Sequence, residues 1–144
     1  MKNYFICKVR YDRLLENGAQ KIVTEQYLVD ALSFTEAELR INKEMEQYVT
    51  GAFSILDISR YKVAESFIGD KYEGDKYYKA KVEYITLDEK SGSEKKQGVY
   101  MLVQATDLEQ ARDIIVQKMK VGMIDYNLAK IEETKILEVF EVFT

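Results

Sequence analysis

The sequence predicts an α+β protein made of two ββαβ repeats, mainly antiparallel sheet with one helix in each repeat. Three segments carry this prediction, because each occurs twice with nearly the same offset. The recurrences are 4–11 (YFICKVRY) with 77–84 (YYKAKVEY), 31–37 (ALSFTEA) with 105–111 (ATDLEQA), and 58–67 (ISRYKVAESF) with 131–140 (IEETKILEVF). Order and spacing are kept along the chain, so we expect a duplication to organise the whole protein, with a pseudo-twofold axis between the repeats.

Each repeat is predicted to open with a β-hairpin. Apolar and polar residues alternate through 4–11 and 77–84, and this period of two predicts half-buried strands. Turn signals follow at Asn17-Gly18 and Ser91-Gly92, and second strands are predicted near 22–29 and 99–103.

A helix follows each hairpin. Ser33 with Glu36, and Asp107 with Gln110, have the spacing of an N-cap and its third helical residue, and Gly51 and Gly122 are expected to end the helices. Apolar residues three and four apart predict one buried face on each helix. The residues expected to be buried are Phe5, Cys7, Val9, Phe34, Ala37, Ile41, Met45 and Ile58, with their equivalents Tyr78, Ala80, Val82, Leu108, Ala111, Ile115, Met119 and Ile131.

Extended segments close each repeat, near 53–58 and 61–67 and near 126–131 and 135–142. We therefore expect repeats at 1–68 and 77–144, joined by the linker 69–76 (GDKYEGDK). One helix covers a single sheet only in part, so we expect the two repeats to share a core and form one compact unit.

Composition excludes several kinds of chemistry. The chain has 144 residues, no histidine, one cysteine and a net charge of −4. The commonest general base and metal ligand are therefore missing, and neither an internal disulfide nor a thiolate metal cluster can form. We expect no metal and no cofactor. The sequence has no membrane-length apolar run and no signal-peptide pattern at its start, so we expect a cytoplasmic protein with no membrane partner.

The phrases 27–38 (YLVDALSFTEAE) and 85–96 (ITLDEKSGSEKK), together with Met101–Ala105, resemble an uncharacterised family known as a domain of unknown function. The resemblance covers nearly the whole chain and implies a bacterial or phage origin. It implies no active residue. The sequence departs from the family pattern at Gln26, where proline is frequent, and at Tyr4 and Tyr77, where tryptophan is frequent.

Paired carboxylates are the only material for general acid–base catalysis. Asp88 with Glu89, and Asp12 with Glu16, are such pairs, but both fall in predicted turns beside cations. Catalytic carboxylates need an enclosed site that separates their pKa values. We therefore expect solvated charges here, and a protein that is not an enzyme.

The candidate binding face lies on the polar side of the first strand of each repeat. Aromatic rings there could stack on bases while cations meet phosphates. Its residues are Tyr4, Lys8, Arg10, Tyr77, Lys79 and Lys81. The alternative is an ordinary exposed sheet face. We expect a small binding or adaptor protein that acts on a protein partner or by self-association, or, as the alternative function, an accessory protein that binds single-stranded nucleic acid. The net charge of −4 disfavours the nucleic-acid alternative.

Overall fold

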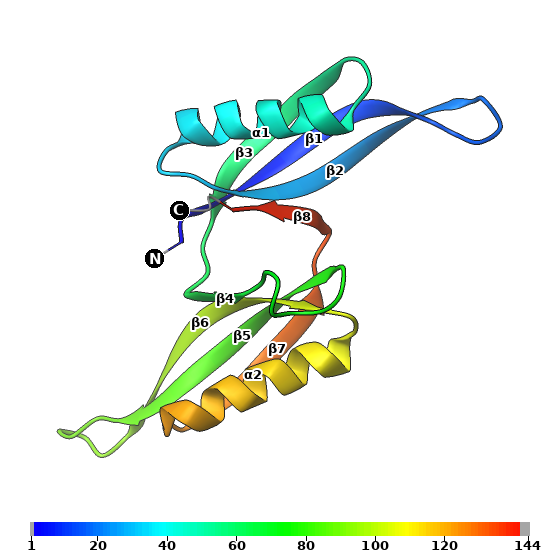
Figure 1. The fold of residues 1–144 in the computed structure, drawn as a ribbon. Helices are drawn as coiled ribbons and strands as arrows, with labels where there is room; N and C mark the ends of the chain where they lie inside the picture. Colours follow the sequence, from blue (N-terminus) through cyan, green and yellow to red (C-terminus); the bar gives the residue numbers. More distant parts are fainter. Residues whose placement is uncertain (1, 142–144) are drawn as a thin grey trace. The chain divides into compact units, whose positions relative to one another are not determined.

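A computed structural model describes residues 2–141, so Met1 and 142–144, the outermost ends of the two predicted repeats, lie outside it. The prediction of an α+β fold is confirmed, with two helices and two mixed sheets of four strands each. The element order follows Figure 1: β1 (Tyr4–Leu14), β2 (Gln20–Asp30), α1 (Phe34–Tyr48), β3 (Phe53–Tyr61), β4 (Glu65–Phe67), β5 (Lys76–Leu87), β6 (Glu94–Ala105), α2 (Leu108–Gly122), β7 (Tyr126–Glu133) and β8 (Ile136–Phe140).

The chain divides into two compact units. Unit 1 contains the residues up to Lys62 and those from Lys135 onward, and unit 2 runs from Val63 to Thr134. The strand orders are equivalent, β3-β1-β2-β8 in unit 1 and β7-β5-β6-β4 in unit 2. Both sheets also have a register shift at the same place, between Lys8 and Val9 in unit 1 and between Lys81 and Val82 in unit 2.

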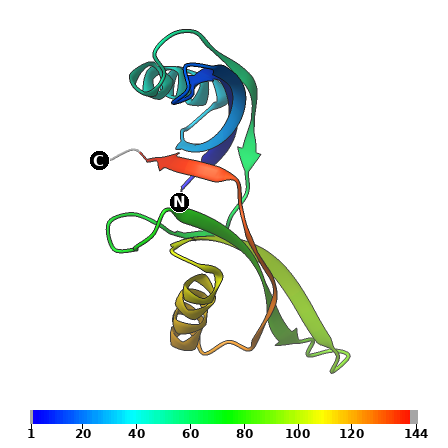
Figure 2. The ribbon, with the colours of Figure 1, turned by 90° about the vertical axis from the view of Figure 1, so that its right-hand side faces the viewer.

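The fourth strand of each sheet comes from the other half of the sequence. Strand β8 pairs in parallel with β2, and β4 pairs in parallel with β6. Figure 2 shows the chain running from β7 in unit 2 to β8 beside β2 in unit 1. The predicted boundaries at 68 and 77 are therefore not the boundaries of the folded units.

The short connections explain this exchange. Strands β2 and β3 both run antiparallel to β1, so they point the same way, and the place beside β2 takes a strand of that same direction. Joining two strands of one direction in one sheet needs a crossover of about a dozen residues or more. Only 62–64 separate β3 from β4. Strand β4 therefore cannot return to its own half, and it pairs in unit 2 instead.

The predicted linker 69–76 is part of unit 2 and is fastened to β6. Gln104 accepts a hydrogen bond from the Gly69 N–H at 2.9 Å through Oε1, and its Nε2 donates to the Gly74 carbonyl at 2.8 Å. Gly74 has φ +104°, and a Cβ there would lie 2.3 Å from the carbonyl carbon of Ala105. The segment read as a linker because glycine marks turns, whereas here glycine permits a close backbone approach.

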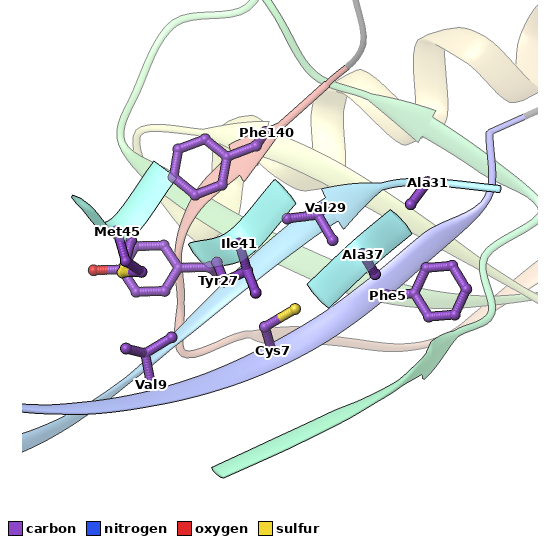
Figure 3. Close-up of a cluster of buried hydrophobic side chains, with 10 residues drawn as sticks. All are labelled: Phe5, Cys7, Val9, Tyr27, Val29, Ala31, Ala37, Ile41, Met45 and Phe140. Atoms are coloured by element: carbon purple, nitrogen blue, oxygen red, sulfur yellow. The ribbon is translucent and has the colours of Figure 1, made fainter. Parts of the chain in front are cut away.

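Each unit has its own core between one helix and one sheet. In unit 1 the core contains side chains from β1, β2, α1 and β8, together with Ala31 directly after β2: Phe5, Cys7, Val9, Tyr27, Val29, Ala31, Ala37, Ile41, Met45 and Phe140 (Figure 3). Unit 2 repeats this arrangement with Tyr78, Ala80, Val82, Ala111, Ile115, Met119 and Phe67 among its members. The predicted inner faces of the first strands and of the helices after their first residue are thus confirmed.

Two of the predicted core residues are wrong, and two are only partly buried. Phe34 is 47% exposed and Leu108 is 49% exposed. Each is the first residue of its helix, so its side chain lies at the end of the helix and covers the sheet only in part. The Phe34 ring still meets Phe5 edge-on at 4.8 Å. Ile58 and Ile131 are half-buried and pack against their cores from the edge strands β3 and β7.

The predicted N-caps are confirmed. Ser33 Oγ accepts from the Glu36 N–H at 3.1 Å, and Asp107 Oδ1 accepts from the Gln110 N–H at 2.8 Å. The return bonds differ from the expected capping box, because Glu36 and Gln110 accept from the N–H of the residue before the cap. Neither helix among the described residues is long and apolar enough to cross a bilayer.

Candidate binding surfaces

In the predicted binding face the tyrosine rings are buried, whereas the cations are exposed or half-buried. Tyr4 is 2% exposed and Tyr77 is 7% exposed, so neither offers a ring for stacking. Lys8 and Arg10 on β1 are exposed, while Lys79 and Lys81 on β5 are half-buried. The prediction of two accessible tyrosines is therefore wrong. Of the four predicted cations, only Lys8 and Arg10 in unit 1 are exposed.

A different tyrosine stands on the polar side of unit 2. Tyr100 of β6 is the cross-strand neighbour of Lys81 and is exposed. The Lys79 ammonium lies over its ring, with Nζ 4.5 Å from the centroid. Its register in the hairpin would have placed it on this side of the sheet, but the prediction considered only the first strands. Because Lys79 covers one face of the ring, the pair is a cation–π contact within the sheet.

The one buried charged side chain among the described residues is Glu25 of β2, which sequence reasoning missed. Tyr11 and Arg13 donate to its Oε1 at 2.5 and 2.6 Å, and Tyr27 donates to its Oε2 at 2.6 Å. Burial, followed by the hydrogen bond to Glu25, raises the pKa of both Tyr11 and Tyr27. Both oxygens of this carboxylate thus have donors from the chain itself, an arrangement that suits a structural role.

This network is particular to unit 1. With the offsets of 73 and 74, the positions of Arg13 and Glu25 correspond to Thr86 and Val99 in unit 2. Val99 packs against the apolar core there. In the sequence, only the position of Glu25 pointed to this network, because strand alternation predicts an inward side chain there.

Unit 2 has an apolar end where α2 stops. Val121 and Met123 are exposed, Met123 to 94%, and Ile124 is 49% exposed. Met123 ends the helix in the left-handed conformation, with φ 53°. The Asp125 carbonyl accepts from the Ile85 N–H at 2.9 Å, which brings this turn alongside the end of β5. We call Leu87, Val121, Met123 and Ile124 the apolar end of unit 2.

The hairpin of unit 1 also ends in exposed apolar side chains. Leu14 is the equivalent of Leu87 in the first half, and both are 71% exposed. Ile22, opposite Asp12 on β2, is exposed as well. Isolated exposed leucines are common on proteins, whereas several together indicate a contact surface. The end of α2, the turn after it and the end of β5 in unit 2 carry more of these exposed apolar residues than the hairpin end of unit 1.

The reactive groups considered from the sequence lie in unreactive surroundings. Cys7 is fully buried, and burial, with a smaller effect of the Asp57 carboxylate, raises the pKa of its thiol to about 12. Asp88 accepts from the Lys90 N–H and pairs with Lys95 at 3.9 Å at an open hairpin turn. Asp12 and Glu16 are exposed. No group of three or more metal-ligating side chains occurs among residues 2–141.

Comparison with known proteins identifies the family. No curated protein and no solved structure matches the chain. A family model described as a domain of unknown function (DUF4494) matches residues 3–142. That match spans both units and both exchanged strands. The chain therefore belongs to this family, whose description assigns no activity.

Proposed function

We propose that the protein is a small, non-catalytic binding or adaptor protein that takes a protein partner at the apolar end of unit 2. The observation that carries the proposal is the grouping of Val121, Met123 and Ile124 beside the end of β5, where Leu87 is also exposed. Removing such side chains from water on association is favourable by about 25 cal/mol per Å². Methionine adapts its shape to different apolar surfaces.

The charge of the β5–β6 hairpin, which carries Leu87, favours a protein partner over a nucleic acid. The segment from Lys79 to Lys96 contains five lysines and four acidic residues, which gives it a net charge of +1. Nucleic-acid sites neutralise several phosphates and carry a clear excess of cations. Exposed apolar side chains next to a hairpin of nearly balanced charge suit a protein interface, which combines an apolar core with a polar rim.

The surroundings of the reactive side chains support a role without catalysis. The Glu25 carboxylate is occupied by three donors from its own unit, and the Cys7 thiol is buried. Asp12 is exposed near the end of β1 and Glu16 is exposed in the turn after it, while Asp88 and Glu89 lie in an open hairpin turn, whereas catalytic carboxylates need an enclosed site. A bacterial or phage origin and a cytoplasmic location stay predictions from the sequence.

The test compares three immobilised forms of the full chain in a bacterial lysate, read by quantitative mass spectrometry. The double variant Leu87→Ser, Met123→Ser removes the centre of the apolar end, and Leu32→Ser, at an exposed leucine of unit 1, is the control. Loss of two buried anchors should weaken binding by about tenfold or more. The proposal fails if no protein is depleted by the double variant and retained by the control.

The alternative function, binding of single-stranded nucleic acid, is favoured by one observation. Lys8 and Arg10 are exposed, and neither forms an ion pair within the part of the chain that the structure describes. Fluorescence anisotropy of a labelled oligonucleotide at low salt tests this function. This function is supported if the wild-type protein binds at micromolar concentration and the double variant Lys8→Glu, Arg10→Glu binds more weakly. The affinity of the variant should also depend less steeply on salt concentration. No binding would leave the adaptor function.

A further inference from the structure

Unit 1 contains a complete binding site for residues 136–141, which we call the seat of β8. Phe140 is 8% exposed, stacks on Tyr27 with ring centroids 5.7 Å apart, and meets Tyr48 at 6.0 Å. The seat also holds the backbone beyond β8, because Arg40 Nη2 donates to the Glu141 carbonyl oxygen and Lys2 Nζ lies 2.9 Å from Glu141 Oε2. Every residue of this seat comes from the part of unit 1 that ends at Lys62.

The nearest candidate strand in the sequence cannot fill this seat. Strand β4 would have to reach from the end of β3 across the width of three strand spacings, about 14 Å. It would also have to travel back along the sheet, because β3 ends level with Asp30 whereas β8 starts level with Gln26. The three residues 62–64 span four Cα steps, at most about 14 Å. The seat therefore needs a β8, either of the same chain or of another copy.

The connection that delivers β8 is short. The Thr134 N–H and hydroxyl both donate to the Tyr77 carbonyl, at 2.8 and 2.7 Å, which fastens Thr134 to unit 2. Only Lys135 remains between this anchor and the start of β8 at Ile136. Short hinge segments favour exchange of an element between copies, because the intermolecular form relaxes the connection while keeping every contact of the element.

We propose that a second copy of this chain is a partner of unit 1, and that two copies exchange β8 reciprocally. Each β8 then lies beside β2 of the other copy, with Phe140 in that copy's core and Glu141 at that copy's Arg40. Within one chain the short connection sets an effective concentration on the order of 1 mM for β8. The exchanged dimer should therefore be rare in dilute solution and form when the chain folds at high concentration. This inference does not depend on the apolar end of unit 2.

The test uses full-length chains with and without an affinity tag. Both are unfolded in guanidinium chloride and refolded together at about 10 µM or about 1 mM, and the ratio of dimer to monomer is measured by light scattering after gel filtration. The ratio should rise about fiftyfold between these concentrations, in proportion to the concentration of monomer that remains. Untagged chain should be captured with tagged chain after joint refolding, and not when the two are mixed already folded. Absence of dimer at about 1 mM would overturn the proposal.

A locked variant separates strand exchange from association of outer surfaces. Leu28 and Val139 are paired across β2 and β8, so cysteines at both positions, in a Cys7→Ala background, can close a disulfide within one chain at low concentration. The oxidised variant should give no dimer at about 1 mM, and reduction should restore it. Equal dimer formation in the locked form would contradict exchange. If this variant does not fold, insertion of Gly-Ser-Gly-Ser after Lys135 is used instead: it should lower the dimer ratio, and an unchanged ratio would contradict the proposal.

Discussion

Val29 of β2 lies beside Phe140 of β8 in parallel pairing, although the two residues come from opposite halves of the sequence. The equivalent pair in unit 2 is Val103 of β6 with Phe67 of β4. Phe140 and Phe67 are each 8% exposed, and each belongs to the core of the unit that contains its partner. Each half of the chain therefore supplies an aromatic side chain that the other half needs to complete its core.

Truncating either exchanged phenylalanine should destabilise the protein strongly. Phe140→Ala and Phe67→Ala should each lower the free energy of unfolding by about 3–5 kcal/mol, because each leaves a cavity and removes ring contacts. Urea denaturation followed by circular dichroism measures the loss. Leu137→Ala, on the exposed side of β8, is the control and should cost far less. Equal losses for Phe140→Ala and Leu137→Ala would contradict the packing of β8.

The central helix residues should matter equally in the two units. Ile41→Ala and Ile115→Ala each open a cavity between a helix and its sheet, and each should cost about 2–5 kcal/mol. Leu39→Ala, on the exposed side of α1, is the matched control. Chemical denaturation of the three variants provides the comparison. A loss below about 1 kcal/mol at Ile41 or Ile115, a level typical of surface changes, would show that a helix face is misassigned.

Glycine should be required at Gly74 more than at Gly69. Both have positive φ, so alanine brings backbone strain of about 1–3 kcal/mol at either position. Only at Gly74 would the new Cβ also overlap backbone, 2.3 Å from the carbonyl carbon of Ala105. Gly74→Ala should therefore be the more destabilising by more than about 1 kcal/mol, as a difference in thermal midpoint will show. Similar midpoints for the two variants would rule out the close approach of this loop to β6.

Alkaline pH should weaken the fold partly through Cys7. Its folded pKa of about 12 exceeds the unfolded value, so the thiol keeps its proton in the native state when the unfolded chain has lost it. This contribution is complete below about pH 9 and is lost as pH rises toward 12, with a slope of up to about 1.4 kcal/mol per pH unit. Tyr11 and Tyr27 add losses of the same sign above about pH 10.

Denaturation of wild type and Cys7→Ala between pH 8 and 10.5 isolates the thiol's share, since the tyrosines are common to both. The variant should show the shallower decline. Parallel curves would mean that the thiol ionises as easily in the native state as in the unfolded chain.

Local patterns in the sequence determined the parts of this fold that depend on neighbouring residues. Alternation through 4–11 placed Phe5, Cys7 and Val9 on the inner face of β1, and the spacing of Ser33 and Glu36 located the start of α1. Strand and helix periodicities alone decide which side chains share a face. The exposure of Lys8 and Arg10 followed from the same alternation.

The tertiary structure decided which strands complete each sheet and which polar groups are buried. Phe67 and Phe140 could be recognised as equivalent from the sequence. Which sheet each of them joins depends on strand direction and on the short length of the connection 62–64, and no local sequence pattern predicts this. Tyr4 and Tyr77 stand at polar-face positions and are nonetheless buried, whereas Tyr100 remains exposed beneath Lys79. Burial depends on everything that packs against a residue, so contacts distant in sequence determined which side chains this protein exposes.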